Sequence, residues 1–138
     1  MTTPEALDRE HTLLTAASRY DALRLRDALA APADEEPPGA PGAAPPLSPE
    51  DSLEMLALGE VIARKAGYGR QLAVRTARAA GASWSQIGAA LGTSKQSAWE
   101  AHARWISDQA EQHRRSGYAG LDDEQVAAAR ANAGGDPD

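Results

Sequence analysis

Polar side chains that can hydrogen-bond nucleic-acid bases follow one another directly after Ser94. Lys95, Gln96 and Ser97 come next in the chain, and Glu100 lies about one helical turn later. Lysine can donate to the acceptors of guanine, glutamine can bond adenine through its amide, and glutamate can accept from cytosine. Recognition helices present their first two turns to the major groove, so these four side chains are candidates for DNA base contacts.

A second set of residues has the chemistry to bind phosphate groups. Guanidinium groups bind phosphates through charge, and residues at a helix start can add free backbone amides. The candidates are Arg75, Arg78, Ser83, Ser85, Gln86 and Arg104. For Gln86 a role as a helix cap alone is equally open. For Glu100, an ion pair with Arg104 four residues later is the alternative to a base contact.

Two short helices with a tight turn between them would position these side chains. Ser83 can cap the first helix, and Gln86 three residues later can reach back to the amide of Ser83. Gly92 suits the left-handed residue that ends a helix, and Ser94 can cap the next one. Gly88 leaves room for two helices to cross closely. The segment therefore predicts a helix-turn-helix.

The charge of the chain is unevenly distributed. The net charge is −6, yet residues 63–116 hold nine basic and three acidic residues, a net charge of +6, which leaves −12 for the rest. A basic segment in an acidic chain is typical of a module that meets phosphates. A solvated arginine-rich helix face is the alternative.

The rest of the sequence predicts an all-α protein in four parts. Thr3 and Pro4 begin a segment to about Ala30 without internal glycine or proline, which predicts a single amphipathic helix. Gly67 and Gly69 could break or kink the helix expected after Ser48. The predicted parts are an N-terminal amphipathic helix (1–30), a linker rich in Pro, Gly and Ala (31–47), a helix-turn-helix DNA-binding module (48–117), and a short helix of about 122–132 with a disordered tail (118–138).

Residues 78–99 resemble a family of small actinobacterial helix-turn-helix proteins. The residues that carry the resemblance are Arg78, Gly81, Ser83, Trp84, Ile87, Gly88, Leu91, Gly92, Ser94, Lys95, Gln96, Ala98 and Trp99. The resemblance implies a DNA-binding tri-helical module similar to region 4 of sigma factors. Thr93 departs from the pattern, in which valine or isoleucine is commoner. The residues before Ser48 are not covered.

Other classes of site find little support in the sequence. Without cysteine, thiolate metal sites and disulfides are excluded, and His102 and His113 lie too far apart for one metal ion. No nucleotide-binding loop or nucleophile motif occurs, so we expect neither an enzyme nor a cofactor. Trp99 and Trp105 lie on an apolar stripe and are expected in the core. No signal peptide or membrane span is evident, so a cytoplasmic protein is expected.

These observations predict a sequence-specific DNA-binding protein, a transcriptional regulator that reads the major groove with the helix that starts at Ser94. Double-stranded DNA is the expected partner, and the small module and its uncovered apolar faces predict a homodimer. The alternative is a protein-interaction module, which would bind a sigma factor, polymerase or toxin through the same shape and the acidic N-terminal helix.

Overall fold

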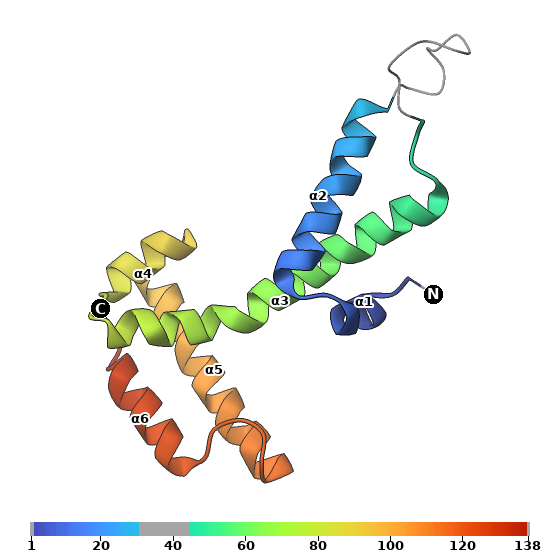
Figure 1. Ribbon diagram of the computed structural model, residues 1–138. Coiled ribbons are helices and arrows are strands. Elements are labelled where there is room, and N and C mark those ends of the chain that lie inside the picture. Colours follow the sequence, from blue (N-terminus) through green and yellow to red (C-terminus); the bar gives the residue numbers. More distant parts are fainter. Residues whose placement is uncertain (1, 31–44, 138) are drawn as a thin grey trace. The chain divides into compact units, whose positions relative to one another are not determined.

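The computed structural model describes residues 2–30 and 45–137, and these residues form six α-helices (Figure 1). The helices are α1 (Pro4–Glu10), α2 (Leu13–Leu29), α3 (Pro49–Ala79), α4 (Trp84–Leu91), α5 (Lys95–Ser116) and α6 (Asp123–Ala133). The prediction of an all-helical protein is confirmed for this part of the chain. Most of the predicted linker, residues 31–44, lies outside the described residues.

The chain divides into two compact units, Met1–Gly67 and Tyr68–Asp138, and the boundary falls within α3. The predicted module of 48–117 has different bounds. The first half of α3 packs with the N-terminal helices, while the second half packs with α4, α5 and α6. Each unit therefore has its own core.

The prediction of one N-terminal helix is wrong, because α1 and α2 are separate. Thr12 interrupts the helix: its hydroxyl accepts from the Thr15 amide at 3.2 Å, and the Thr15 hydroxyl accepts from the Thr12 amide at 2.9 Å. His11 closes α1 in an extended conformation. A threonine side chain that binds local amides competes with the helical ladder, which explains the break.

The helix does not break at Gly67 and Gly69, and α3 runs on through both residues. Glycine keeps its backbone N–H, so unlike proline it leaves the helical hydrogen bonds intact at a cost of about 1 kcal/mol. Both glycines have open space where a side chain would stand.

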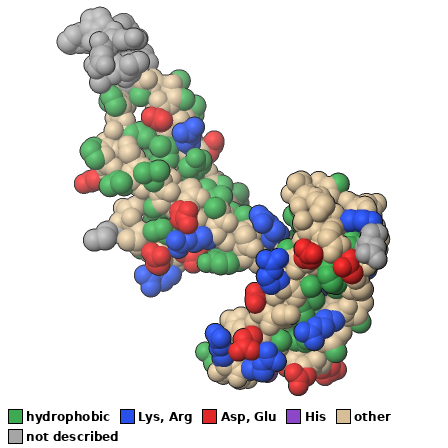
Figure 2. All heavy atoms as spheres, turned by 180° about the vertical axis from the view of Figure 1, so that it is seen from behind, with side chains coloured by type: hydrophobic (Ala, Val, Ile, Leu, Met, Phe, Trp, Pro, Cys, Tyr) green, Lys and Arg blue, Asp and Glu red, His purple; other side chains and the backbone are tan. Residues whose placement is uncertain are grey.

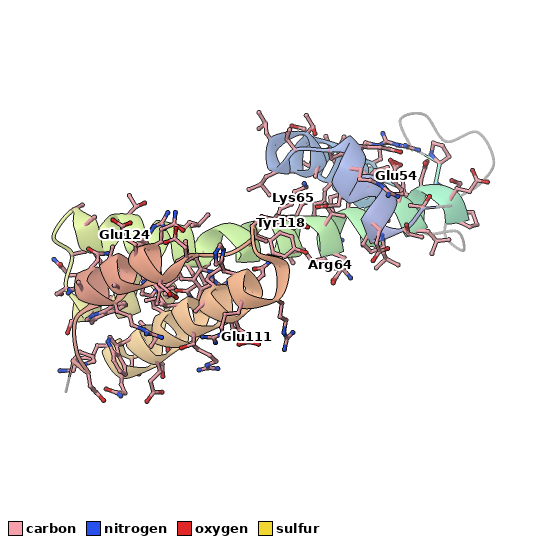
Figure 3. The ribbon with its side chains drawn as sticks, turned by 90° about the horizontal axis from the view of Figure 1, so that it is seen from below. Glu54, Arg64, Lys65, Glu111, Tyr118 and Glu124 are labelled. Atoms are coloured by element: carbon pink, nitrogen blue, oxygen red, sulfur yellow. The ribbon has the colours of Figure 1, made fainter. Side chains whose placement is uncertain are left out.

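In the first unit, α1 and α2 bury apolar side chains against α3. Leu23, Leu58 and Val61 are fully buried there. Ion pairs on α3 surround this core, and Figure 3 labels their α3 members: Glu54 lies 2.8 Å from Arg19, Arg64 3.2 Å from Glu5, and Lys65 3.0 Å from Asp8. Exposed ion pairs contribute little to stability, so these pairs help to orient α1 and α2 on α3, while burial of apolar side chains stabilises the unit.

In the second unit, α4, α5 and α6 surround the last part of α3. Val74, Ile87, Ile106 and Val126 lie in its core, one from each of these helices. The helix predicted near residues 122–132 is thus an integral part of this core. Asp122 caps α6, and Gly117 ends α5 with φ of 77°, a left-handed conformation that glycine adopts without strain.

Candidate nucleic-acid interface

The turn between α4 and α5 is tight because of two glycines. Gly92 ends α4 in the left-handed region at φ of 72°. Gly88 is buried, and a Cβ atom there would lie 2.8 Å from the Thr93 carbonyl oxygen and 3.0 Å from the Lys95 amide nitrogen. The start of α5 therefore approaches α4 at a distance that only glycine allows.

Side-chain caps begin both helices of this pair. The Ser83 hydroxyl accepts from the Gln86 amide at 3.1 Å, and the Gln86 side-chain oxygen accepts from the Ser83 amide at 2.9 Å. Ser94 accepts from the Ser97 amide at 3.0 Å and caps α5. The predicted caps are confirmed. Ser83, Ser85 and Gln86 are exposed at the start of α4.

The first two turns of α5 carry the four residues expected to contact bases. Lys95, Ser97 and Glu100 are exposed, whereas Gln96 is half-buried. The Gln96 amide nitrogen donates to Glu100 Oε1 and to Asp136 Oδ2, both at 3.0 Å. The side chain with the clearest capacity to read adenine is thus held by two carboxylates of the same unit.

Glu100 accepts from Gln96, and among the described residues it forms no ion pair with Arg104, which was the alternative to a base contact. Arg104 is exposed and points out from α5 a turn beyond Glu100. Its guanidinium is therefore accessible to an incoming anion.

The Arg78 side chain forms contacts within the second unit. Its guanidinium donates to the carbonyl oxygens of Asn132 at 3.2 Å and Ala82 at 3.0 Å, and it stands 5.2 Å from the ring centre of Trp84. Arg75 is half-buried, and its own carbonyl accepts from Asn132. Both arginines thus help to fix α6 against α3. A phosphate contact by Arg78 would have to compete with these bonds.

The three tryptophans contribute to the core, as predicted for Trp99 and Trp105. Trp84 is buried, and its indole N–H donates to the Ala133 carbonyl at 2.8 Å. Trp99 donates to the next carbonyl, that of Gly134, at 3.1 Å. Two consecutive tail carbonyls therefore accept from two indoles, which fixes the chain after α6 beside the start of α5.

His102 is fully buried between the rings of Trp84 and Trp105. Its Nδ1 lies 2.9 Å from the Gln71 side-chain oxygen, and its Nε2 has no hydrogen-bond partner among the described residues. Burial lowers the pKa of His102 below its ordinary value of 6.5, and the charges of Arg75 and Arg78 lower it further. This histidine is therefore neutral near pH 7.

A groove between α3, α4 and α5 lies next to the first turn of α5, and the sequence analysis did not identify it. Arg70 and Gln71 from α3 face Thr93 and Ser97 across it, and the other lining residues are Ala90, Leu91, Ala98 and Ala101. Arg70 is exposed, which gives this side of α5 a cation that could meet a phosphate. Arg70 and Ser97 lie 27 positions apart in the sequence, so no local pattern indicates that they line the same groove.

Acidic side chains neutralise part of the basic segment. Figure 2 shows one face of the molecule, on which Asp and Glu side chains lie among Lys and Arg side chains. On α5 itself, Glu111 binds both Arg114 at 2.7 Å and Arg115 at 3.2 Å. Part of the positive charge counted along the sequence is thus neutralised locally.

In the part of the chain that the structure describes, no group of three or more His, Asp or Glu side chains could hold a metal ion, and no helix is long and apolar enough to cross a membrane. Comparison of the sequence with family models and with curated proteins, and of the fold with solved structures, found no match.

Proposed function

We propose that the second unit is a helix-turn-helix that binds double-stranded DNA and regulates transcription. The observation that supports this proposal most directly is the close approach of α5 to α4 at Gly88, followed by an exposed polar first turn on α5. A tight turn between two helices leaves the first residues of the second helix accessible, and proteins of this class insert that part of the helix into the major groove.

In this proposal the residues of α5 have separate roles. Lys95, Gln96, Ser97 and Glu100 contact base edges, and Gln96 exchanges its bond to Asp136 for one to a base. Arg104 contacts phosphate from α5. Ser83, Ser85 and Gln86 contact phosphate from the start of α4, and Arg70 does so from the groove. Arg78 remains a candidate for phosphate contact only with loss of its present side-chain bonds. The present bond of Arg75 is accepted by its backbone carbonyl, so its guanidinium remains a candidate without that loss.

A binding titration at two salt concentrations tests the proposal. The full chain is titrated against a duplex selected from fragmented genomic DNA and against a scrambled duplex, by fluorescence anisotropy. The logarithm of the binding constant should fall linearly with the logarithm of the salt concentration, with a slope of about −0.9 per phosphate contact. Lys95→Ala should weaken binding, whereas Arg9→Ala, the same charge change at an exposed position of α1, should not. Equal effects of the two changes, or no binding at low salt, would exclude this assignment.

A protein-interaction module is the second candidate, and one observation favours it. Glu100 and Asp136 place two carboxylates at the first turn of α5, beside Gln96. Carboxylates repel phosphates and attract basic side chains of a protein. If Asp136→Asn leaves DNA affinity unchanged but weakens capture of a purified polymerase or sigma subunit, this second function is supported.

A further inference from the structure

The side-chain amide nitrogen of Gln96 has both of its donor hydrogens engaged. It donates to Glu100 Oε1 and to Asp136 Oδ2, each at 3.0 Å. A glutamine NH2 group carries two donor hydrogens, and an ionised carboxylate can only accept, so each hydrogen has one carboxylate as its partner. The same chemistry fixes the orientation of the amide, with Oε1 on the side away from the two acids. In this state Gln96 offers an incoming base an acceptor and no donor.

This state excludes the base contact for which glutamine is best suited. In a bidentate contact with adenine, glutamine accepts from N6 and donates to N7. The acceptor is in place, but the donor becomes available only when one carboxylate leaves. Glu100 lies on α5 with Gln96, whereas Asp136 belongs to the segment that follows α6. Release of Asp136 therefore frees the donor without any change in α5.

The segment that carries Asp136 is lightly held. Gly134, Gly135 and Asp136, which we call the strap, are all exposed. The Gly134 carbonyl accepts from the Trp99 indole at 3.1 Å, and the Asp136 carboxylate accepts from Gln96. Gly134 also borders a hollow between α5 and α6. Movement of the strap would thus break hydrogen bonds but would remove no side chain from the core.

A fixed helix end precedes the strap. Ala133, the last residue of α6, is buried, and its carbonyl accepts from the Trp84 indole at 2.8 Å. Gly134 then leaves the helix with φ of 73°, which glycine adopts without strain. Two successive glycines between a fixed helix end and an acidic residue are suited to act as a hinge. The strap can therefore leave α5 while α6 stays in place.

We propose that the strap is autoinhibitory: Asp136 withholds the Gln96 donor from DNA and places a negative charge beside the start of α5. A base that bonds this donor must replace Asp136, and the carboxylate also repels nearby phosphates. This inference rests on the proposed DNA-binding function. It makes Asp136 a determinant of affinity and of base preference in that function, because DNA and the strap compete for the same amide.

Removal of the carboxylate tests the inference in the full chain. Asp136→Ala should raise affinity for the selected duplex about three- to tenfold, the worth of one hydrogen bond, and should raise it less for the scrambled duplex. Asp123→Ala removes the same charge at an exposed position at the other end of α6, and it should leave the preference between the duplexes unchanged. Anisotropy titrations measure both. An equal gain on the two duplexes from Asp136→Ala would show an effect of charge alone and overturn the inference.

A double-mutant cycle links this gain to Gln96. In a chain that already carries Gln96→Ala, Asp136→Ala should no longer favour the selected duplex over the scrambled one, because the donor that it releases is gone. If the preference rises as much without Gln96 as with it, the strap does not act on this amide.

A modified base tests the bond that Asp136 withholds. 7-Deazaadenine lacks the N7 acceptor and keeps N6, and it can replace each adenine of the selected duplex in turn. The Asp136→Ala variant should lose its gain at one of these positions. The native chain should lose less there, since Gln96 can return to Asp136. If the variant keeps its gain at every position, adenine N7 is not the acceptor and the inference is wrong.

Trp99→Phe loosens the strap without a change in charge. It removes the indole N–H that holds Gly134 and keeps an aromatic ring at that site. Affinity for the selected duplex should rise about two- to fivefold, because part of the hold on the strap is lost. Trp105→Phe is the control, since the Trp105 indole donates to no other residue that the structure describes. Circular dichroism checks that both variants keep their helices. Native affinity after Trp99→Phe would argue against a restraining strap.

The outcomes separate this inference from the function on which it rests. If the native chain binds the selected duplex and Asp136→Ala binds it no more tightly, the strap is rejected and the proposed function stands. If neither chain binds any DNA fragment at low salt, the DNA-binding assignment fails. The strap then fails with it, because its release exposes no surface that reads DNA.

Discussion

His102 shows how one buried polar side chain constrains the second unit. Its ring is stacked 5.4 Å from the ring centre of Trp105, and only one of its nitrogens has a partner, Gln71. A neutral imidazole fits this place, whereas an imidazolium would bring an unpartnered charge next to Arg75 and Arg78. The residue therefore links the stability of the unit to its protonation.

Stability should fall as the pH decreases below the ordinary pKa of histidine, about 6.5. The folded protein holds the pKa of His102 below that value, so in this window the unfolded chain binds more protons than the folded one. Neutral His102 makes its full contribution to the free energy of unfolding above pH 6.5. This contribution decreases as the pH falls from 6.5 to the lower pKa of His102 in the folded protein. Urea unfolding at a series of pH values measures this slope. His102→Leu should flatten it.

Gln96 is the residue at which base reading can be separated from general affinity. If it bonds an adenine, Gln96→Ala should cost roughly 1–3 kcal/mol on the selected duplex and little on a scrambled one. Gln112→Ala supplies a control of the same type on α5, at an exposed position far from the first turn. Anisotropy titrations measure both. Equal weakening on the two duplexes would show that Gln96 does not read sequence.

At the scale of the elements, the crossing of α4 and α5 depends on the space at Gly88. A methyl group there would press on backbone atoms of Thr93 and Ser94, so Gly88→Ala should destabilise the second unit by about 1–3 kcal/mol. Gly67→Ala is the matched control, because that site is helical with open space, and it should stabilise the chain by about 0.5–1 kcal/mol. Thermal unfolding followed by circular dichroism compares the two. Similar effects from both would mean that the crossing is not tight.

The elements also show what local sequence can and cannot predict. Ser83, Gln86, Gly92 and Ser94 specify their caps through residues within four positions, and their geometry was predicted correctly. Thr12 carried a comparable signal, a threonine followed three residues later by a second one, yet the absence of glycine and proline up to Ala30 favoured one continuous helix.

Contacts between residues that are distant in the sequence could not be predicted from local sequence patterns. The Gln96 bond to Asp136 joins positions 40 apart, and Arg78 reaches Asn132 across 54 positions. Nothing in either neighbourhood indicates the partner. The candidate base-reading residues were thus identifiable by type and spacing, whereas the contacts that occupy Gln96 and Arg78 depend on where α6 packs.

At the scale of the whole molecule, the boundary within α3 predicts how the chain tolerates truncation. A fragment of residues 68–138 keeps its own core and should fold, with a helical circular dichroism spectrum and a cooperative thermal transition. A fragment of residues 48–138 lacks α1 and α2, so Leu58 and Val61 become exposed and the fragment should self-associate. Light scattering distinguishes the two. An unfolded shorter fragment would contradict the division into independent cores.

The tryptophans give the two units different optical properties. Trp84, Trp99 and Trp105 all belong to the second unit, while the first contains Tyr20 as its aromatic side chain among the described residues. Intrinsic indole emission therefore reports on the second unit alone, and far-ultraviolet dichroism reports on both. Because two of the indoles donate to the carbonyls of Ala133 and Gly134, their emission maximum also responds to release of the C-terminal segment. A denaturant titration read by both signals would resolve the unfolding of each unit without an added label.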